Sequence, residues 1–302
     1  MLSIFPELIQ LFTGSILLFL GADYLINSSK NIAEKFAIPK IIIGITLVAF
    51  GTSLPEMIVS ILATLRGQSE IVIGNVIGSN IANIGLILGV ASIISPLYYS
   101  FSKLKYDLFF LLGITALPIL SIQFDCMDFY TGLAYICILL IYCYYLFNSE
   151  HDVEEVESSN LKNVTLFLLL GFFALGFGSH FFVEGAIGLA EFLNIPSIII
   201  GMTIVAIGTS LPELATTLVG IKRGESTLVI GNIIGSNIMN IVAVLGVSFM
   251  IREISVISNT VNNQLIVMSV LTALLFLSLY FRNKLSRIIG MVFCRFIVFL
   301  FF

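Results

Sequence analysis

Two stretches of this chain are near copies of each other. PKIIIGITLVAFGTSLPE at 39–56 returns as PSIIIGMTIVAIGTSLPE at 196–213, and IVIGNVIGSNIANI at 71–84 returns as LVIGNIIGSNIMNI at 228–241. Both pairs are separated by the same 157 positions, and about 28 of the 46 aligned residues are identical across this region. Such self-similarity indicates a chain built from two copies of one structural unit.

The composition predicts that these copies lie in a lipid bilayer. The 302 residues are 58% hydrophobic and 11% charged, whereas a soluble domain is about 25% charged. A helix needs about 20 apolar residues to cross a membrane. The predicted spans are 7–26, 41–65, 71–97, 106–124, 129–147, 164–183, 197–221, 227–250, 263–281 and 286–302. The net charge of −4 offers no basic surface, so no nucleic-acid partner is expected.

Lysine and arginine are distributed unevenly over the loops that connect the predicted spans. These loops are numbered in chain order, starting with the loop after the first span. The even-numbered loops hold only Arg66 and Arg252. The odd-numbered loops hold Lys30, Lys35, Lys40, Lys103, Lys105, Lys162, Lys222, Arg223, Arg282, Lys284 and Arg287. Positive loops stay in the cytoplasm, so both termini are expected outside the cell membrane. The acidic segment 148–163 is then a cytoplasmic linker, and it lacks the ligand spacing of an EF-hand loop.

The span count determines how the two copies are related. Each copy holds five spans, and five is odd, so the second copy enters the membrane from the opposite side. The sequence therefore predicts an all-α membrane protein of ten transmembrane helices, arranged as two inverted five-helix repeats, 1–147 and 164–302. Inverted repeats with interrupted helices are typical of secondary transporters, which bind their substrate near the midplane between the copies.

The repeated GTSLPE motif places one carboxylate of each copy inside the membrane. Glu56 and Glu213 lie within runs of spanning length. A carboxylate at the centre of a spanning helix costs about 2.5–3.5 kcal/mol, so such residues usually mark ion or proton pathways. A purely structural role, with each glutamate protonated or hydrogen-bonded across helices, is the alternative. Pro55 and Pro212 disturb the helix one residue before each glutamate and free backbone carbonyls.

Other oxygen-bearing side chains accompany the two glutamates in both copies. They are Thr52, Ser53, Ser79 and Asn83 in the first copy and Thr209, Ser210, Ser236 and Asn240 in the second. Neither cysteine nor histidine joins them. Oxygen ligands favour hard cations such as Ca²⁺, Mg²⁺ and Na⁺. Two carboxylates are balanced by one Ca²⁺ or by two Na⁺, which suggests that the ions exclude each other. The remaining motif amides fit a structural role and a ligand role equally: Asn75, Asn80, Asn232 and Asn237.

GTSLPE followed by GN-x-IGSN-x-x-N, present twice in inverted halves, resembles the cation/Ca²⁺ exchanger superfamily, and within it the prokaryotic Na⁺/Ca²⁺ exchanger branch. The resemblance covers essentially the whole chain. It implies a core of the second, third, seventh and eighth spans, past which the first and sixth spans slide. It implies Glu56 and Glu213 as the central ligands. The further ligands that it implies are Thr52, Ser53, Ser79, Thr209, Ser210, Ser236 and the carbonyls of Ala49 and Ala206.

The predicted function is a secondary antiporter that exchanges Ca²⁺ for Na⁺ by alternating access. Some prokaryotic relatives carry aspartate at the position of Asn240, which leaves the ion stoichiometry and proton dependence open. Exchange of a divalent cation for H⁺ or K⁺ is an alternative, and a cation channel is another. The ATP-binding motif GxxxxGK[ST] does not occur. We expect no enzyme activity, no cofactor, no ATP and a monomer. Asp23 and His180 are expected to be interfacial polar residues, and a gating or proton-linked role is the alternative.

Overall fold

The computed structural model describes residues 5–148, 163–193, 208–255, 258–282 and 284–301. Helices make up nearly all of these residues. The exceptions with regular structure are two short strands, β1 (Leu97–Tyr98) and β2 (Lys284–Leu285), which pair antiparallel. The acidic linker 148–163 lies almost wholly outside the described residues, as does Ala206.

In the first half of the chain, the observed helices begin and end close to the loops that the sequence predicts between spans. Their bounds are α1 (Phe5–Lys35), α2 (Lys40–Ile43), α3 (Ala49–Thr52), α4 (Leu54–Leu65), α5 (Ser69–Ile81), α6 (Gly89–Ile94), α7 (Phe101–Ile114), α8 (Ala116–Gln123) and α9 (Phe129–Asn148). Two π-helical turns, η1 (Gly44–Val48) and η2 (Ala82–Leu88), join α2 to α3 and α5 to α6.

The second half repeats this order. Its helices are α10 (Val164–Phe192), α13 (Leu211–Lys222), α14 (Ser226–Ile238), α15 (Leu245–Ile251), α16 (Ser258–Phe281) and α17 (Arg287–Phe301), with a π-helical turn η4 (Met239–Val244) between α14 and α15. Helices α13 and α14 have the same lengths as α4 and α5 and start 157 residues later. The internal repeat of the sequence is therefore also a repeat of secondary structure.

Among the described residues, seven helical segments are long and apolar enough to cross a membrane, with Ser69–Ile94, Phe101–Gln123 and Ser226–Ile251 each counted as one segment. The pair Lys40–Thr52 and Leu54–Leu65 forms an eighth, bent by 46°. Of the ten predicted spans, the seventh begins among residues outside the described ranges, and the tenth corresponds to α17, which has 15 residues. The glycine-rich third and eighth spans each form one unbroken helical segment, which contains a π-helical turn near its middle.

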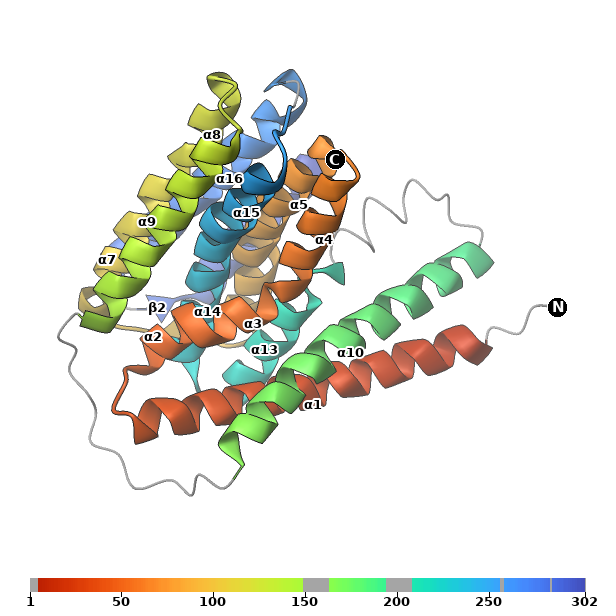
Figure 1. Cartoon of the computed structure of the whole chain (residues 1–302). Coiled ribbons are helices and arrows are strands. Elements are labelled where there is room, and N and C mark those ends of the chain that lie inside the picture. The colour runs from red at the N-terminus through yellow and green to blue at the C-terminus, as the bar shows by residue number, and fades with distance from the viewer. Residues whose placement is uncertain (1–4, 149–162, 194–207, 256–257, 283, 302) are drawn as a thin grey trace.

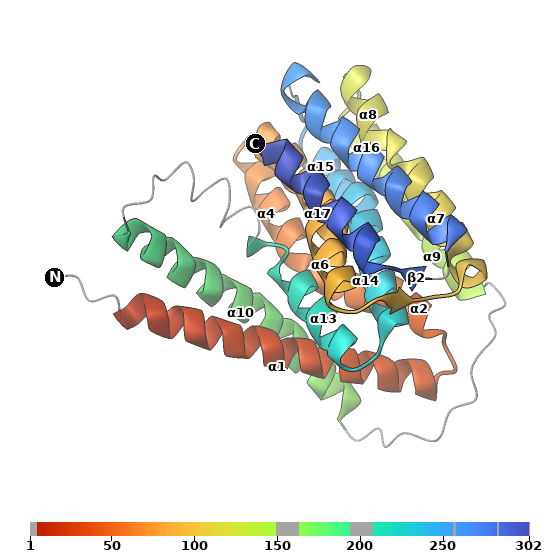
Figure 2. The same ribbon diagram turned by 180° about the vertical axis from the view of Figure 1, so that it is seen from behind.

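The helices form a bundle with one pair lying along its side (Figures 1 and 2). Helices α1 and α10 pack against each other over most of their length. Glycines make this approach possible, because a Cβ at Gly14 would lie 2.5 Å from the backbone of Phe182, and one at Gly21 would lie 2.8 Å from that of Leu175. Helix α4 points toward one end of the bundle and α13 toward the other (Figure 1).

Helix α14 lies at the centre of the bundle. All of its residues from Leu228 to Ile238 are buried. It packs closely on the first repeat, since a Cβ at Gly231 would lie 2.8 Å from the carbonyl of Ile41. Gly231 and Gly235, four residues apart, therefore let α14 lie close to the backbone of the first repeat.

Candidate cation-binding site

The helix of the first repeat is broken at Ser53, and Ser210 has the same backbone conformation in the second repeat. Ser53 separates α3 from α4 with φ −86° and ψ 5°, and Ser210 precedes α13 with φ −89° and ψ 9°. Pro55 and Pro212 occupy the first turn of the helix that follows, where a missing backbone N–H does no harm. Each break thus places a serine and a glutamate at the start of a helix, in the same way in both copies.

The two glutamates lie fully inside the protein. Glu56 and Glu213 are both 0% exposed. The carboxylate of Glu213 accepts hydrogen bonds from Ser53 Oγ at 3.2 Å and from Ser236 Oγ at 3.3 Å. The carboxylate of Glu56 accepts one from Ser210 Oγ at 3.3 Å. Each glutamate is therefore bonded by the serine at the helix break of the other repeat.

Thr52 belongs to the same hydrogen-bonded group. Its hydroxyl donates to Asn232 Oδ1 at 3.2 Å and lies 3.4 Å from Ser236 Oγ. The carbonyl of Ala49 is a further acceptor, 3.3 Å from Thr52 Oγ1, and it also accepts the backbone N–H of Ser53 at 2.9 Å. The structure thus brings α3, α13 and α14 together around Glu213.

Several polar atoms of the predicted ligands are buried without a hydrogen-bond partner among the described residues. They are Oε2 of Glu56 and Glu213, Oγ of Ser79, Oγ1 of Thr209, and both amide atoms of Asn83 and Asn240. A buried polar group without a partner costs free energy. The presence of this many such groups in one place therefore needs an explanation. A bound cation would satisfy the oxygens. Asn83 and Asn240 also lie in the π-helical turns η2 and η4, a feature frequent at functional sites.

The site contains few ionisable groups. Among the described residues no three histidine, cysteine, aspartate or glutamate side chains are clustered. The donors are two carboxylates with hydroxyl, amide and carbonyl oxygens. This set suits Na⁺ or Ca²⁺, whose ligands are oxygens, and does not suit a thiolate- or imidazole-bound metal.

Sequence reasoning missed two hydroxyl side chains beside the site, Thr216 and Ser60. Asn232 donates from Nδ2 to Thr216 Oγ1 at 3.2 Å, and Asn75 donates to Ser60 Oγ at 2.9 Å. The asparagines were open to either role, and their place four residues before Ser79 and Ser236, on the same helix face, was the available signal. The repeat gives no signal for Thr216, because its counterpart is Val59. Ser60 and its counterpart Thr217 both carry a hydroxyl, which was the available signal for Ser60.

Asp23 and His180, which occupy equivalent positions in the two repeats, have different surroundings. Asp23 accepts a hydrogen bond from Nε of Arg223 at 2.8 Å, which ties α1 to the end of α13. His180 is exposed. Both lie outside the hydrogen-bonded group around Glu56 and Glu213.

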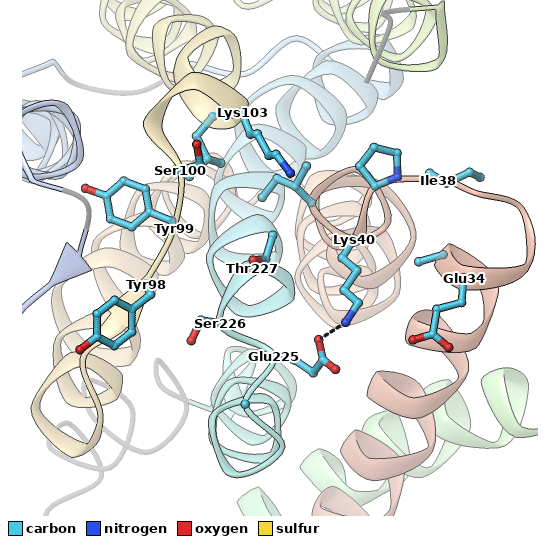
Figure 3. Close-up of a pocket in the computed structure, with 15 residues that line it drawn as sticks. Glu34, Ile38, Lys40, Tyr98, Tyr99, Ser100, Lys103, Glu225, Ser226 and Thr227 are labelled. Atoms are coloured by element: carbon cyan, nitrogen blue, oxygen red, sulfur yellow. Dashed lines mark hydrogen bonds and ion pairs between the residues drawn. The ribbon is translucent and has the colours of Figure 1, made fainter. Parts of the chain in front are cut away.

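A cavity of about 530 Å³ lies elsewhere, between the end of α1 and the starts of α2, α7 and α14. Lys40, Lys103, Glu34 and Glu225 are among the residues that line it (Figure 3). The Glu225 carboxylate is 2.9 Å from Lys40 Nζ and 3.3 Å from Lys30 Nζ. Since two ammonium groups already neutralise it, this cavity is a poor cation site.

Known proteins share this architecture. The sodium–calcium exchanger NCX_Mj, in a structure soaked with Na⁺ and Sr²⁺, superimposes with a TM-score of 0.86 at 33% identity, covering 98% of both chains. The sodium/calcium exchanger MaX1 of Methanosarcina acetivorans is 34% identical, covering 82% of this chain and 83% of its own. The inner membrane protein YrbG of Escherichia coli is 33% identical, covering 80% of this chain and 78% of its own.

The putative antiporter CaxA of Alkalimonas amylolytica is 34% identical, with 91% of this chain and 90% of its own covered. Residues 7–148 and 163–302 match the family described as sodium/calcium exchanger protein. The chain is thus a multi-pass membrane transporter, not an enzyme, and it belongs to the sodium/calcium exchanger family.

Proposed function

We propose that the chain is a secondary antiporter that exchanges Ca²⁺ for Na⁺ by alternating access. The observation that carries this proposal is a group of buried oxygens on Glu56, Glu213, Ser79 and Thr209 that have no hydrogen-bond partner within the described part of the chain. These oxygens belong to residues that the repeated motifs single out as ligands. A cation that binds among them replaces the missing hydrogen-bond partners and offsets the burial of two carboxylates.

The charge of the site supports exchange between the two ions. Glu56 and Glu213 carry two negative charges when ionised, which one Ca²⁺ or two Na⁺ neutralise. Binding both sets together would leave excess positive charge inside the membrane, where an unbalanced charge is costly. Mutually exclusive occupancy couples the outward movement of one ion to the inward movement of the other.

The full ligand set of this proposal comprises both glutamates and the oxygens of ten further residues. They are Thr52, Ser53, Ser79, Asn83, Ala49, Thr209, Ser210, Ser236, Asn240 and Ala206. The relatives support Na⁺ and Ca²⁺ as the two exchanged ions: NCX_Mj is described as a sodium–calcium exchanger and MaX1 as a sodium/calcium exchanger. Asn240 supplies an amide without a titrating carboxylate, which favours Na⁺ over H⁺ as the coupling ion.

The proposal includes a membrane topology. The repeats 1–147 and 164–302 enter the cell membrane from opposite sides, with the acidic linker 148–163 in the cytoplasm and both termini outside. The excess of lysine and arginine in the odd-numbered loops supports this orientation. A monomer suffices, since both halves of the site come from one chain.

Transport into liposomes tests the function. Purified protein is reconstituted, the vesicles are loaded with Na⁺, and ⁴⁵Ca²⁺ uptake is measured after dilution into Na⁺-free buffer. We expect uptake that requires the Na⁺ gradient and is lost in Glu56→Gln and Glu213→Gln. Asp107→Asn is the matched control, because Asp107 is also buried, 4% exposed, but accepts its hydrogen bond from Tyr142, away from the site. Uptake driven by a pH or K⁺ gradient instead would identify H⁺ or K⁺ as the coupling ion. Ca²⁺ flux that needs no gradient of a second ion would indicate a channel.

A further inference from the structure

We propose that Asn232 is a positioning residue for cation binding. It orients the hydroxyl of Thr52 so that the oxygen lone pairs, and not the hydrogen, face the bound ion. This inference rests on the proposed function, since it assumes that Thr52 is a ligand. Asn232 itself need not touch the ion.

The orientation of the Asn232 amide follows from its neighbours. Thr216 Oγ1 donates to the carbonyls of Pro212 at 2.9 Å and Glu213 at 3.0 Å. A hydroxyl has one hydrogen, so Thr216 can only accept from Asn232. The NH₂ group of Asn232 therefore faces Thr216 at 3.2 Å, and its carbonyl oxygen faces Thr52 at 3.2 Å. Asn232 is 1% exposed, so both groups are shielded from bulk solvent.

The Asn232 carbonyl then accepts the hydrogen of Thr52. The lone pairs of Thr52 Oγ1 stay available, and a cation binds lone pairs. Without Asn232, the Thr52 hydrogen can go to the carbonyl of Ala49, 3.3 Å away, or to Ser236 Oγ, 3.4 Å away. Either bond would engage an oxygen that belongs to the proposed ligand set. Asn232 thus keeps two ligand oxygens available.

The first repeat lacks this arrangement. Asn75, the counterpart of Asn232, donates to Ser60 Oγ at 2.9 Å and to the carbonyl of Glu56 at 3.1 Å, both on α4 of its own repeat. Thr209, the counterpart of Thr52, has no hydrogen-bond partner among the described residues. Within the described residues, then, Asn232 bonds across the repeats and Asn75 bonds only within its own.

Equilibrium ⁴⁵Ca²⁺ binding to the purified protein tests this role in a double-mutant cycle. We expect Asn232→Ala to raise the Ca²⁺ dissociation constant about tenfold. The same substitution should have less than about a twofold effect in a Thr52→Val background, where no hydroxyl remains to orient. It should regain its full effect in a Thr52→Ser background, which restores the hydroxyl. A merely structural role predicts the same effect in all three backgrounds and would overturn the proposal.

Thr216→Val is a second variant that does not depend on the folding of Asn232→Ala. The first repeat has Val59 at the equivalent position, so valine fits this place in the fold. The change removes the acceptor that fixes the Asn232 amide. We expect it to weaken Ca²⁺ binding, and we expect no such effect of Thr216→Val in the Thr52→Val background. Asn75→Ala, alone and with Thr209→Val, is the matched control and should give additive effects. Unchanged binding in Thr216→Val would contradict the proposal. Because binding is measured without a gradient, a failure of exchange alone leaves this test intact.

Discussion

The hydroxyl of Ser53 donates a hydrogen bond to the carboxylate of Glu213, 3.2 Å away on the other repeat. The reciprocal pair, Ser210 and Glu56, is 3.3 Å apart. The helix break of one copy therefore supports the carboxylate of the other, and both serines are nearly fully buried. Neither five-helix repeat contains a complete site on its own.

These cross-repeat bonds predict equivalent effects of two substitutions. Ser53→Ala and Ser210→Ala each remove a hydrogen bond to a carboxylate and a hydroxyl oxygen. We expect each to raise the half-saturating Ca²⁺ concentration for exchange about tenfold, which corresponds to about 1.4 kcal/mol. Ser92→Ala is the control, since Ser92 is also 0% exposed but donates its hydrogen bond to the carbonyl of Leu88, at 2.8 Å in its own helical segment. A large loss in only one of the two serine variants would contradict the symmetric arrangement.

The packing of α14 on the first repeat predicts that Gly235 cannot be replaced. A Cβ there would lie 2.6 Å from Cα of Ile45 and 2.7 Å from Cβ of Ala49. We expect Gly235→Ala to destabilise the protein by about 1–3 kcal/mol through overpacking, seen as a lower melting temperature in detergent. Gly113→Ala in α7 should be tolerated, because no described residue lies within 4 Å of a Cβ at that position. Equal melting temperatures for the two variants would refute the close approach.

The ion pairs of Glu225 predict a salt-dependent contribution to stability. This carboxylate bridges Lys30 on α1 and Lys40 on α2, and the two lysine side chains are 42% and 30% exposed. Because solvent screens such pairs, we expect Glu225→Gln to cost about 1 kcal/mol or less, with the difference shrinking as salt is added. Melting curves at low and high NaCl, with the exposed Glu70→Gln as control, provide the measurement. A loss that does not change with salt would exclude an electrostatic cause.

The native cysteines allow the topology to be tested. Cys126 is exposed between α8 and α9, in an even-numbered loop that the charge distribution places outside. A membrane-impermeant maleimide applied to intact cells should label Cys126, and Cys126→Ser should abolish the signal. In that background, Ser158→Cys in the acidic linker should react only after the cells are permeabilised. The reverse labelling pattern would invert the proposed orientation.

The sequence predicted the architecture and much of the candidate site because the repeat is explicit in the residues. The shared offset, Pro55 and Pro212 located the helix breaks, and the predicted burial of both glutamates is confirmed. The π-helical turns at 82–88 and 239–244 were not predictable, since π and α segments use the same apolar residues. Nor was the bond from Thr52 to Asn232, because it depends on how the two repeats pack.

Competition between Na⁺ and Ca²⁺ for the purified protein tests the central claim most directly. Equilibrium ⁴⁵Ca²⁺ binding is measured while Na⁺ is raised at constant ionic strength. The shared site predicts that Na⁺ displaces all bound Ca²⁺, that K⁺ at the same concentration does not, and that Glu56→Gln and Glu213→Gln each weaken Ca²⁺ binding strongly. Ca²⁺ that stays bound at saturating Na⁺, or binding that survives both substitutions, would contradict a single site shared by the two ions.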